Sequence, residues 1–380
     1  MISQVKFERH LTRFDGIMLC VGMIIGSGVF SVPGLILNEL NNSVGLVILM
    51  YIVGAIVSVF GVLAYIELGT MRPVSGGEKE YLEYAFPKVK KLFAFSFTQT
   101  MVWLMRPTAC AADSISFGQF IIYSFTGQFD GNNYWTARLL AIFCISFTTF
   151  IHGYYPKMGI WIQDALTMLK ISVLIFTIII GMLAAGNVGS LRRADENFVG
   201  GNSTSVDASS VASAFLQMSF AYDGWNNINY SLDEVIDPVK NLPFISLSSI
   251  SIVSFLYIFS TLSFFLVVPK STLTENSTVI AADMFKIALG DFWGQRLMPF
   301  LIGCSSFGSV MCMAFGVSRV TLAAAQEGYF PLSISDRLGK LNSKNGPISA
   351  LILNCCITTL LILIPSQSAY QVFFLIILIE

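Results

Sequence analysis

The chain has 380 residues, of which 54% are hydrophobic and only 12% are charged, and its formal net charge at pH 7 is -1. About a quarter of the residues in an ordinary soluble domain are charged, so this composition excludes a soluble protein and predicts an integral membrane protein in a lipid bilayer. The near-zero net charge, without any basic stripe, also excludes nucleic acid as a partner.

Apolar runs follow one another along the chain, and most reach the roughly 20 residues that a membrane-spanning helix needs. Polar connections separate these runs, and residues 75–86 instead predict a short amphipathic helix along the membrane interface. The last apolar run is still open at Glu380, which predicts an incomplete tenth span. The runs lie at about 14–37, 43–69, 92–124, 137–154, 160–185, 209–230, 244–268, 297–325, 347–364 and from 368 onward.

Lysine and arginine are unevenly distributed between alternate loops. If residues 1–13 are cytoplasmic, the inner loops hold most of these residues, which is the bias typical of cytoplasmic loops. We therefore expect a cytoplasmic N-terminus, with the plasma membrane as the expected location. The seven cysteines lie in apolar runs without metal-ligand spacing, so neither a disulfide nor a metal site nor another cofactor is expected.

The first span contains the sequence GMIIGSGVF at residues 22–30. A glycine inside a helix costs about 1 kcal/mol relative to alanine, so Gly26, Ser27 and Gly28 predict a local unwinding. The second half of the span would then begin near Ser27, with its free amide groups at membrane depth, where they suit a carboxylate. The alternative is a patch of small residues for close helix packing.

The sixth span contains a second candidate break, at Asp223 and Gly224, which three more helix-poor polar or aromatic residues follow. The half-helix before this break would end in free carbonyl groups, which suit an ammonium group. Breaks in spans one and six together are typical of inverted-repeat transporters with a site between the repeats. The two spans therefore predict a site for a zwitterion.

Several ionisable residues lie inside the predicted spans, where each charge costs about 2.5 to 3.5 kcal/mol on insertion scales. We expect them to face protein or a watery cavity. Lys170 in span five can bridge the carbonyl groups of the broken first span; the alternative is a lysine that snorkels to the interface. The set is Glu67, Arg106, Asp113, Asp164, Lys170 and Asp223.

Long motifs resemble one known family. GMIIGSGVFSVPG, WIQDALTMLK and FAYDGWNNINYSLDEVIDPVKNLP are similar to the amino acid-polyamine-organocation superfamily and, within it, to the L-type amino acid transporters. SGGEKEYLEY resembles the fungal methionine permease branch. The resemblance implies an all-α integral membrane fold of the leucine-transporter type, a 5+5 inverted repeat with helices 1 and 6 broken. Residues 14–185 would form the first repeat and 209–380 the second, in one transporter domain, truncated within span 10.

The resemblance also implies roles for single residues. The amides of the first break would bind the substrate carboxylate, the carbonyl of Ile24 would face the amine, and Phe220 would cover the site. Lys170 matches a family lysine that stands where sodium-driven relatives bind their ion, which implies transport without sodium. The implied substrate site consists of Ile24, Gly26, Ser27, Gly28, Phe220, Ala221 and Asp223.

Two carboxylates depart from the family pattern. Asp223 stands where the family has glycine: it either strengthens zwitterion binding or couples a proton, or it only caps the second half-helix. Asp113 either sets the selectivity of the side-chain pocket or neutralises Arg106. Arg319 and Glu327 match family positions at cytoplasmic ends, where inner-gate ion pairs or interface anchors are expected.

These features predict a secondary transporter of neutral L-amino acids, with methionine as a candidate, that works by alternating access. Fungal relatives imply proton symport. The alternatives are a sodium-independent exchanger and a non-transporting truncated or sensor-type membrane protein. An enzyme is not expected, since no catalytic triad or metal spacing occurs. Animal members of the family that the chain resembles bond covalently to a single-span glycoprotein through a cysteine after span three. The corresponding loop here, FTGQFDGNNYW, has no cysteine, so no such partner is expected.

Overall fold

The computed structural model describes residues 8–86, 90–127, 134–185, 206–269, 272 and 280–364. Within these ranges the chain is helical, apart from turns and one isolated bridge between Leu11 and Val235. Six helical segments there are long and apolar enough to cross a membrane. The predicted integral membrane protein is therefore confirmed. The expected tenth span lies outside the described residues.

The first half of the chain begins with two short helices in place of one span. Its helices are α1 (Arg13–Ile24), α2 (Gly28–Glu39), α3 (Val44–Met71), α4 (Glu78–Ala85), α5 (Lys90–Thr100), the π-helical turn η1 (Met101–Met105), α6 (Arg106–Thr126), α7 (Tyr134–Tyr154) and α8 (Pro156–Ala185).

The second half also begins with two short helices. Its helices are α10 (Ala208–Ala221), the 3-10 helix η3 (Asn227–Glu234), α11 (Pro238–Val267), α13 (Ile280–Leu289), the π-helical turn η5 (Trp293–Leu297), α14 (Met298–Gln326), α15 (Leu332–Leu338) and α16 (Ile348–Leu363).

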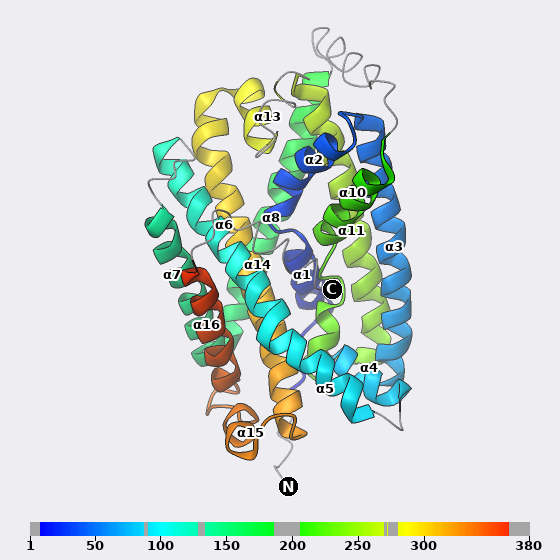
Figure 1. The fold of residues 1–380 in the computed structure, drawn as a ribbon, viewed down its shortest axis with the longest axis vertical. Coiled ribbons are helices and arrows are strands. Elements are labelled where there is room, and N and C mark those ends of the chain that lie inside the picture. Colours follow the sequence, from blue (N-terminus) through cyan, green and yellow to red (C-terminus); the bar gives the residue numbers. More distant parts are fainter. Residues whose placement is uncertain are drawn as a thin grey trace.

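The two halves repeat one order of elements. Each has a broken span, a long helix, a short helix, and then a helical segment that contains a π-helical turn, which lies between α5 and α6 in the first half and directly before α14 in the second. The short helix of the first half, α4, lies at the lower end of the bundle, whereas its counterpart α13 lies at the upper end (Figure 1). The second half is therefore inverted relative to the first, which is the arrangement that the sequence predicted.

Helices of the two halves pack on one another. Helix α14 packs along α6, α11 packs along α3, and the half-helix α10 packs against α2. In a membrane, such packing depends on close van der Waals contact more than on the hydrophobic effect. The halves thus share one helix-packed interior, and the two broken spans lie within it (Figure 1).

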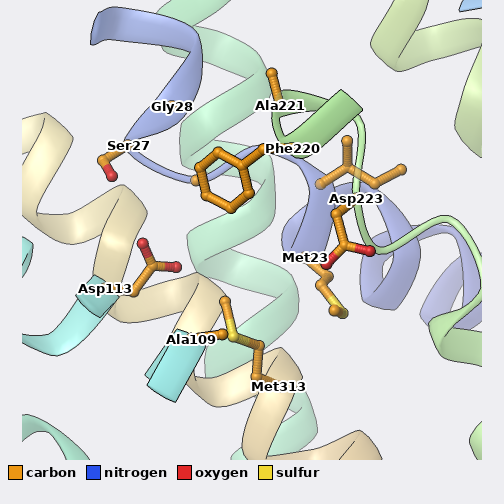
Figure 2. Close-up of a pocket in the computed structure, with 11 residues that line it drawn as sticks. Met23, Ser27, Gly28, Ala109, Asp113, Phe220, Ala221, Asp223 and Met313 are labelled. Atoms are coloured by element: carbon orange, nitrogen blue, oxygen red, sulfur yellow. The ribbon is translucent and has the colours of Figure 1, made fainter. Parts of the chain in front are cut away.

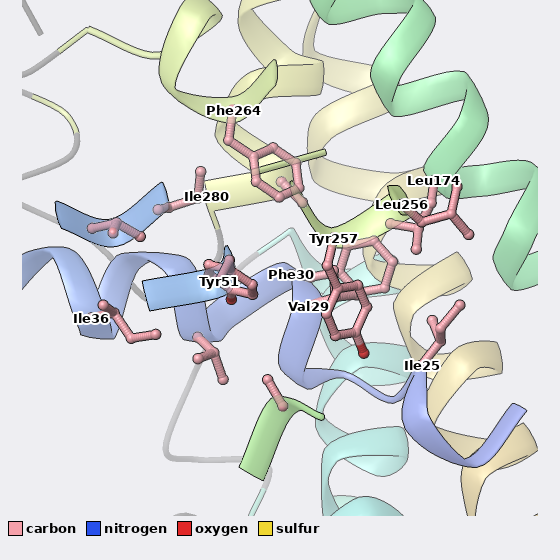
Figure 3. Close-up of a cluster of buried hydrophobic side chains, with 14 of the residues drawn as sticks. Ile25, Val29, Phe30, Ile36, Tyr51, Leu174, Leu256, Tyr257, Phe264 and Ile280 are labelled. Atoms are coloured by element: carbon pink, nitrogen blue, oxygen red, sulfur yellow. The ribbon is translucent and has the colours of Figure 1, made fainter. Parts of the chain in front are cut away.

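An apolar cluster supports the second half of the first span. Phe30 of α2 is fully buried in one apolar cluster with Tyr257 and Phe264 of α11, and Figure 3 shows it next to Tyr257. The ring of Tyr51, on α3, stands edge-on to that of Tyr257, with 6.2 Å between their centroids. Aromatic pairs in this geometry gain about 0.5 to 1.5 kcal/mol beyond their burial. This packing holds α2 in place although its connection to α1 is unwound.

The short helix α4 forms where a short helix was predicted, and several of its polar side chains are buried. Lys79 is fully buried, and Glu80 is nearly so. The Tyr81 hydroxyl donates a hydrogen bond of 2.7 Å to Asn229 in η3. The expectation that this segment lies along the membrane interface stays a prediction, and its buried polar side chains have partners within the bundle.

Candidate functional site

The predicted break in the first span is confirmed. Helix α1 ends at Ile24, helix α2 starts at Gly28, and the side chain of Ser27 makes no capping hydrogen bond to α2. The first amide groups of any helix have no partner within that helix. Those of α2 begin deep in the bundle, so polar N–H groups and the positive end of the helix dipole are available there.

Lys170 holds the other side of this break. Its Nζ donates hydrogen bonds of 2.6 Å to the carbonyl oxygens of Gly22 and Ile25, and one of 2.9 Å to Oγ of Ser309. The lysine is 2% exposed, so the alternative of a snorkelling side chain is wrong. A protonated amine thus satisfies the carbonyl groups that the unwound backbone releases at the end of α1.

The carbonyl group of Ile24 already has two donors. The hydroxyl of Tyr257 donates to it at 2.7 Å, and the backbone N–H of Gly26 does so at 3.0 Å. An amine would therefore compete with both for this oxygen. Ile24 lines the cavity described below, but the expected contact between its carbonyl and a substrate amine stays a prediction.

The second predicted break is also confirmed, although its second half is a 3-10 helix and not an α-helix. Helix α10 ends at Ala221, and η3 starts at Asn227. The side-chain amide of Asn227 donates to the carbonyl of Cys312 at 3.3 Å, and that of Asn229 donates to the carbonyl of Asn226 at 3.2 Å. The Asn229 bond is local, and asparagine side chains that bond to nearby backbone in this way compete with α-helical geometry.

Asp223 does not cap this second half-helix. The N-cap of η3 is Asn226, and it makes no side-chain capping bond. The backbone N–H of Asp223 donates to the carbonyl of Phe220 at 3.1 Å, so that oxygen has one donor already. The capping alternative for Asp223 is therefore wrong in this structure.

Gly224 lies at the turn of the second break, with φ of 109°, and an added Cβ would lie 2.6 Å from Cγ of Met23. Replacing it with alanine combines an unfavourable backbone conformation with a clash. We expect Gly224→Ala to lower stability by about 1 to 3 kcal/mol, measured as a lower Tm in detergent. Gly45→Ala is the control, because nothing lies within 4 Å of its added Cβ. Equal Tm values for the two variants would contradict this expectation.

The two breaks face one cavity. It is lined by residues from α1, α2 and the end of α10, together with residues from α6 and α14, and Figure 2 shows most of these side chains. Lys170 lies behind the break and is not in the lining. The lining residues are Met23, Ile24, Gly26, Ser27, Gly28, Ala109, Asp113, Phe220, Ala221, Asp223 and Met313.

This lining contains every residue that the sequence assigned to substrate binding and to pocket selectivity. It also contains three residues that the sequence analysis missed. Met23 and Ala109 are neighbours of predicted residues, since Met23 precedes Ile24 and Ala109 is one helical turn before Asp113, so helix periodicity could have found them. Met313 gives no such signal, because it reaches the cavity only through the packing of α14.

Arg106 and Asp223 form the ion pair at one side of the cavity. Nη1 of Arg106 lies 3.6 Å from Oδ2 of Asp223; the arginine side chain is 7% exposed and the aspartate side chain 55%. Nη2 of Arg106 also donates to the hydroxyl of Tyr230 at 3.4 Å. Among the described residues, the carboxylate paired with Arg106 is thus that of Asp223. The alternative that Asp113 neutralises Arg106 is wrong.

Glu78 of α4 connects this pair to one end of the bundle, and the sequence analysis missed it. Its Oε1 accepts hydrogen bonds from Tyr65 at 3.0 Å, Asn226 at 2.5 Å and Tyr230 at 3.1 Å. Its Oε2 is buried and has no partner within the described part of the chain. Burial raises the pKa of this carboxyl group. Tyr230 thus bonds both Glu78 and Arg106.

A buried ion pair closes the same end of the bundle. Nε and Nη2 of Arg319 donate to the two carboxylate oxygens of Glu234, at 2.8 and 3.2 Å. The backbone N–H groups of His10 and Leu11 both donate to the carbonyl of Glu234, at 2.8 Å each. The N-terminal segment and η3 are therefore tied together. Arg319 thus forms an ion pair with Glu234. Glu327 forms its ion pair with Lys79.

Glu327 belongs to a cluster of three carboxylates around one amine. Lys79 makes short ion pairs with Glu80, at 2.6 Å, and with Glu327. The carboxylate oxygens of Glu80, Glu83 and Glu327 lie within 4.8 Å of one another. Since the Lys79 ammonium is already bound to two of them, the cluster gives no reason to invoke a metal ion. Burial, with the neighbouring carboxylates Glu80 and Glu83, raises the pKa of Glu327 to about 7, although Lys79 opposes this.

The raised pKa of Glu327 gives a pH prediction. The pKa of Glu327 is about 7 in the folded state and near 4.5 in the unfolded state, so the folded state binds this proton more tightly. Protonation of Glu327 therefore favours the folded state fully below pH 4.5, and this contribution to stability is lost as the pH rises to about 7. We expect Glu327→Gln to match the wild type in acid and to be about 1 to 2 kcal/mol more stable at alkaline pH. Tm against pH in detergent measures this. Asp336→Asn, at an exposed carboxylate of α15, is the control. If Glu327→Gln is less stable than wild type at alkaline pH, the prediction is contradicted.

The comparisons with known proteins agree with this geometry. The model of the family described as Amino acid permease matches residues 11–378. The chain belongs to the amino acid permease family. It is 31% identical to the high-affinity methionine permease of Saccharomyces cerevisiae over 359 residues, which are 92% of this chain and 60% of that protein. It is 34% identical to the human large neutral amino acids transporter small subunit 2 over 369 residues, which are 96% of this chain and 65% of that protein.

Solved structures show the same fold. A structure of MhsT in complex with L-phenylalanine has a TM-score of 0.59 at 16% identity, and the match covers 94% of this chain and 80% of that one. Mhp1, a nucleobase-cation-symport-1 family transporter, has a TM-score of 0.54 at 12% identity, covering 98% and 76%. The predicted fold class is therefore confirmed. The chain spans about 60 to 65% of the length of the two sequence relatives above.

Proposed function

We propose that this permease is a secondary transporter of neutral L-amino acids, with L-methionine as the first candidate, that works by sodium-independent proton symport. The observation that carries the proposal is the pair of opposed breaks on one cavity, with amide groups at the start of α2 and a carboxylate, Asp223, across from them. Amides suit the carboxylate of an amino acid, and Asp223 suits its ammonium group.

Three observations support the finer parts of this proposal. The cavity wall includes Met23, Met313 and the ring of Phe220, which suit an apolar side chain. The Lys170 ammonium is bonded to two carbonyl oxygens of the first span, so a fixed positive charge satisfies them without a metal ion, which supports transport without sodium. A methionine permease is among the relatives.

We further propose that the end of the bundle closed by Glu234 and Arg319 faces the cytoplasm of a plasma-membrane protein. The cavity would then be sealed from the cytoplasm in this structure. Transport by alternating access requires the tie between the N-terminal segment and η3 to separate, so that the inner side opens while α2 and α10 close above the substrate.

Uptake by the purified 380-residue chain in proteoliposomes tests this function. Radiolabelled L-methionine, L-leucine and L-phenylalanine are supplied under an imposed pH gradient, with sodium or with potassium outside. We expect accumulation that collapses when the pH gradient is dissipated and that is the same in both salts. Uptake only into vesicles preloaded with amino acid would favour exchange, and binding without accumulation would favour the sensor-type alternative.

A further inference from the structure

Asp113 of α6 lies beside the amide groups of the first break. A Cβ added to Gly26 would lie 3.7 Å from Oδ2 of Asp113 and 4.0 Å from Oδ1, with Ser309 Oγ at 3.4 Å. In Figure 2 the Asp113 carboxyl group lies on the same side of the cavity as Ser27. Asp223 is on the opposite side and is paired with Arg106. The two cavity carboxylates therefore have different neighbours.

This position creates a conflict of charge with the proposed substrate. If the amides around Ser27 bind the carboxylate of an amino acid, that carboxylate comes to lie next to Asp113. Two carboxylates that share one site do not both remain ionised; one proton is retained between them. The repulsion is removed when Asp113 is protonated, and its O–H can then donate a hydrogen bond to the substrate.

The charged groups nearby do not remove this conflict. The nearest cation is Lys170 of α8, which can balance Asp113 in the empty cavity but is a single charge held by Gly22, Ile25 and Ser309. Arg106, on the same helix as Asp113, is paired with Asp223. Substrate binding thus places a second carboxylate near one ammonium group. The titratable groups that act on Asp113 or are acted on by it are Lys170, Cys110, Cys144 and Tyr257. Asp223 is the other carboxylate of the cavity wall.

We propose that Asp113 takes up one proton when the substrate carboxylate binds and that it carries the proton of the symport. The proton comes from the water on the side to which the cavity is open, and no other bond forms or breaks. After the cavity opens to the other side, the substrate leaves, Asp113 is again beside Lys170 alone, and the proton passes to the water on that side. This inference rests on the proposed function and assigns the proton to Asp113 and not to Asp223.

Proton uptake on binding tests the proposal. L-methionine is titrated into the chain in nanodiscs by calorimetry, at a fixed pH, in two buffers with different heats of ionisation, which counts the protons taken up. We expect net uptake that approaches one proton per L-methionine as the pH rises. Affinity should fall about tenfold per pH unit in the alkaline range. In Asp113→Asn, the proton uptake and the pH dependence of affinity should both disappear. Asp223→Asn should retain both, with proton uptake counted per L-methionine bound even if its affinity is lower.

A second ligand keeps the test independent of any variant. L-methioninol has the ammonium group and side chain of methionine but no carboxylate, so wild-type protein should bind it without proton uptake. Equal uptake with both ligands overturns the proposal, as does uptake that persists in Asp113→Asn or that is lost only in Asp223→Asn. L-methionine binding without any proton uptake refutes this inference alone. If no neutral amino acid binds, the proposed function fails, and the inference fails with it.

Discussion

Replacing Lys170 with methionine is expected to reduce L-methionine uptake at least about tenfold and to lower stability. The ammonium group donates to the carbonyl oxygens of Gly22 and Ile25. The hydroxyl of Ser309 lies 3.2 Å from both oxygens, and that of Ser305 lies 3.4 Å from the oxygen of Ile25 and 3.0 Å from that of Gly26. Each hydroxyl donates one hydrogen, so two donors remain for three carbonyl oxygens. At least one buried carbonyl group therefore loses its partner, which costs about 1 to 3 kcal/mol. If a free-energy cost of this size falls on the conformation of the first break that binds substrate, the affinity for substrate falls about tenfold or more.

The measurement is initial uptake in proteoliposomes, with Tm of the same preparations in detergent. Lys157→Met is the matched control, because Lys157 lies on the same helix, α8, but is exposed. We expect the control to keep wild-type uptake and Tm. Wild-type uptake by Lys170→Met would show that the break does not need this cation.

The buried pair of Glu234 and Arg319 is expected to give the largest loss of stability on single substitution. Both side chains are 1% exposed. Removing one partner leaves an uncompensated charge in the interior, which costs about 3 to 5 kcal/mol. We therefore expect Glu234→Leu and Arg319→Met each to lower the Tm strongly.

The double variant separates charge from packing. Because it leaves no unpaired charge, the double variant should recover much of the loss that each single variant shows. Asp291→Asn is the control: it breaks an exposed pair with Lys286, whose side chains are 75% and 48% exposed, and should change stability little. Losses that simply add in the double variant would refute the charge explanation.

The sequence was sufficient to locate the elements that depend on local chemistry. Glycine costs helix stability wherever it stands, so Gly26 and Gly224 marked breaks that the structure contains. A charge at membrane depth is expensive in any fold, so Lys170 and Asp113 were expected inside the protein or at a cavity, and they lie there. These inferences needed no knowledge of which helices are neighbours.

The sequence did not predict which charged residues pair with one another. Arg319 was expected to have an ion-pair or anchoring role, but its partner is Glu234, 85 residues earlier in the chain. Lys79 was predicted on a short amphipathic helix without a partner, and it joins Glu80 to Glu327, 248 residues away. Asp223 had a local alternative, helix capping, but the structure pairs it with Arg106. Each partner depends on where the inverted repeats place distant helices.

Amino-acid type and spacing alone established a membrane protein with two interrupted spans, because the cost of polar groups in lipid and of glycine in a helix is a local property. Only the packing of α6 and α14 against the broken spans placed Asp113 beside the amide groups of α2 and Met313 in the cavity wall. Electrostatic interactions depend on distance, and these distances are set by contacts between segments far apart in sequence.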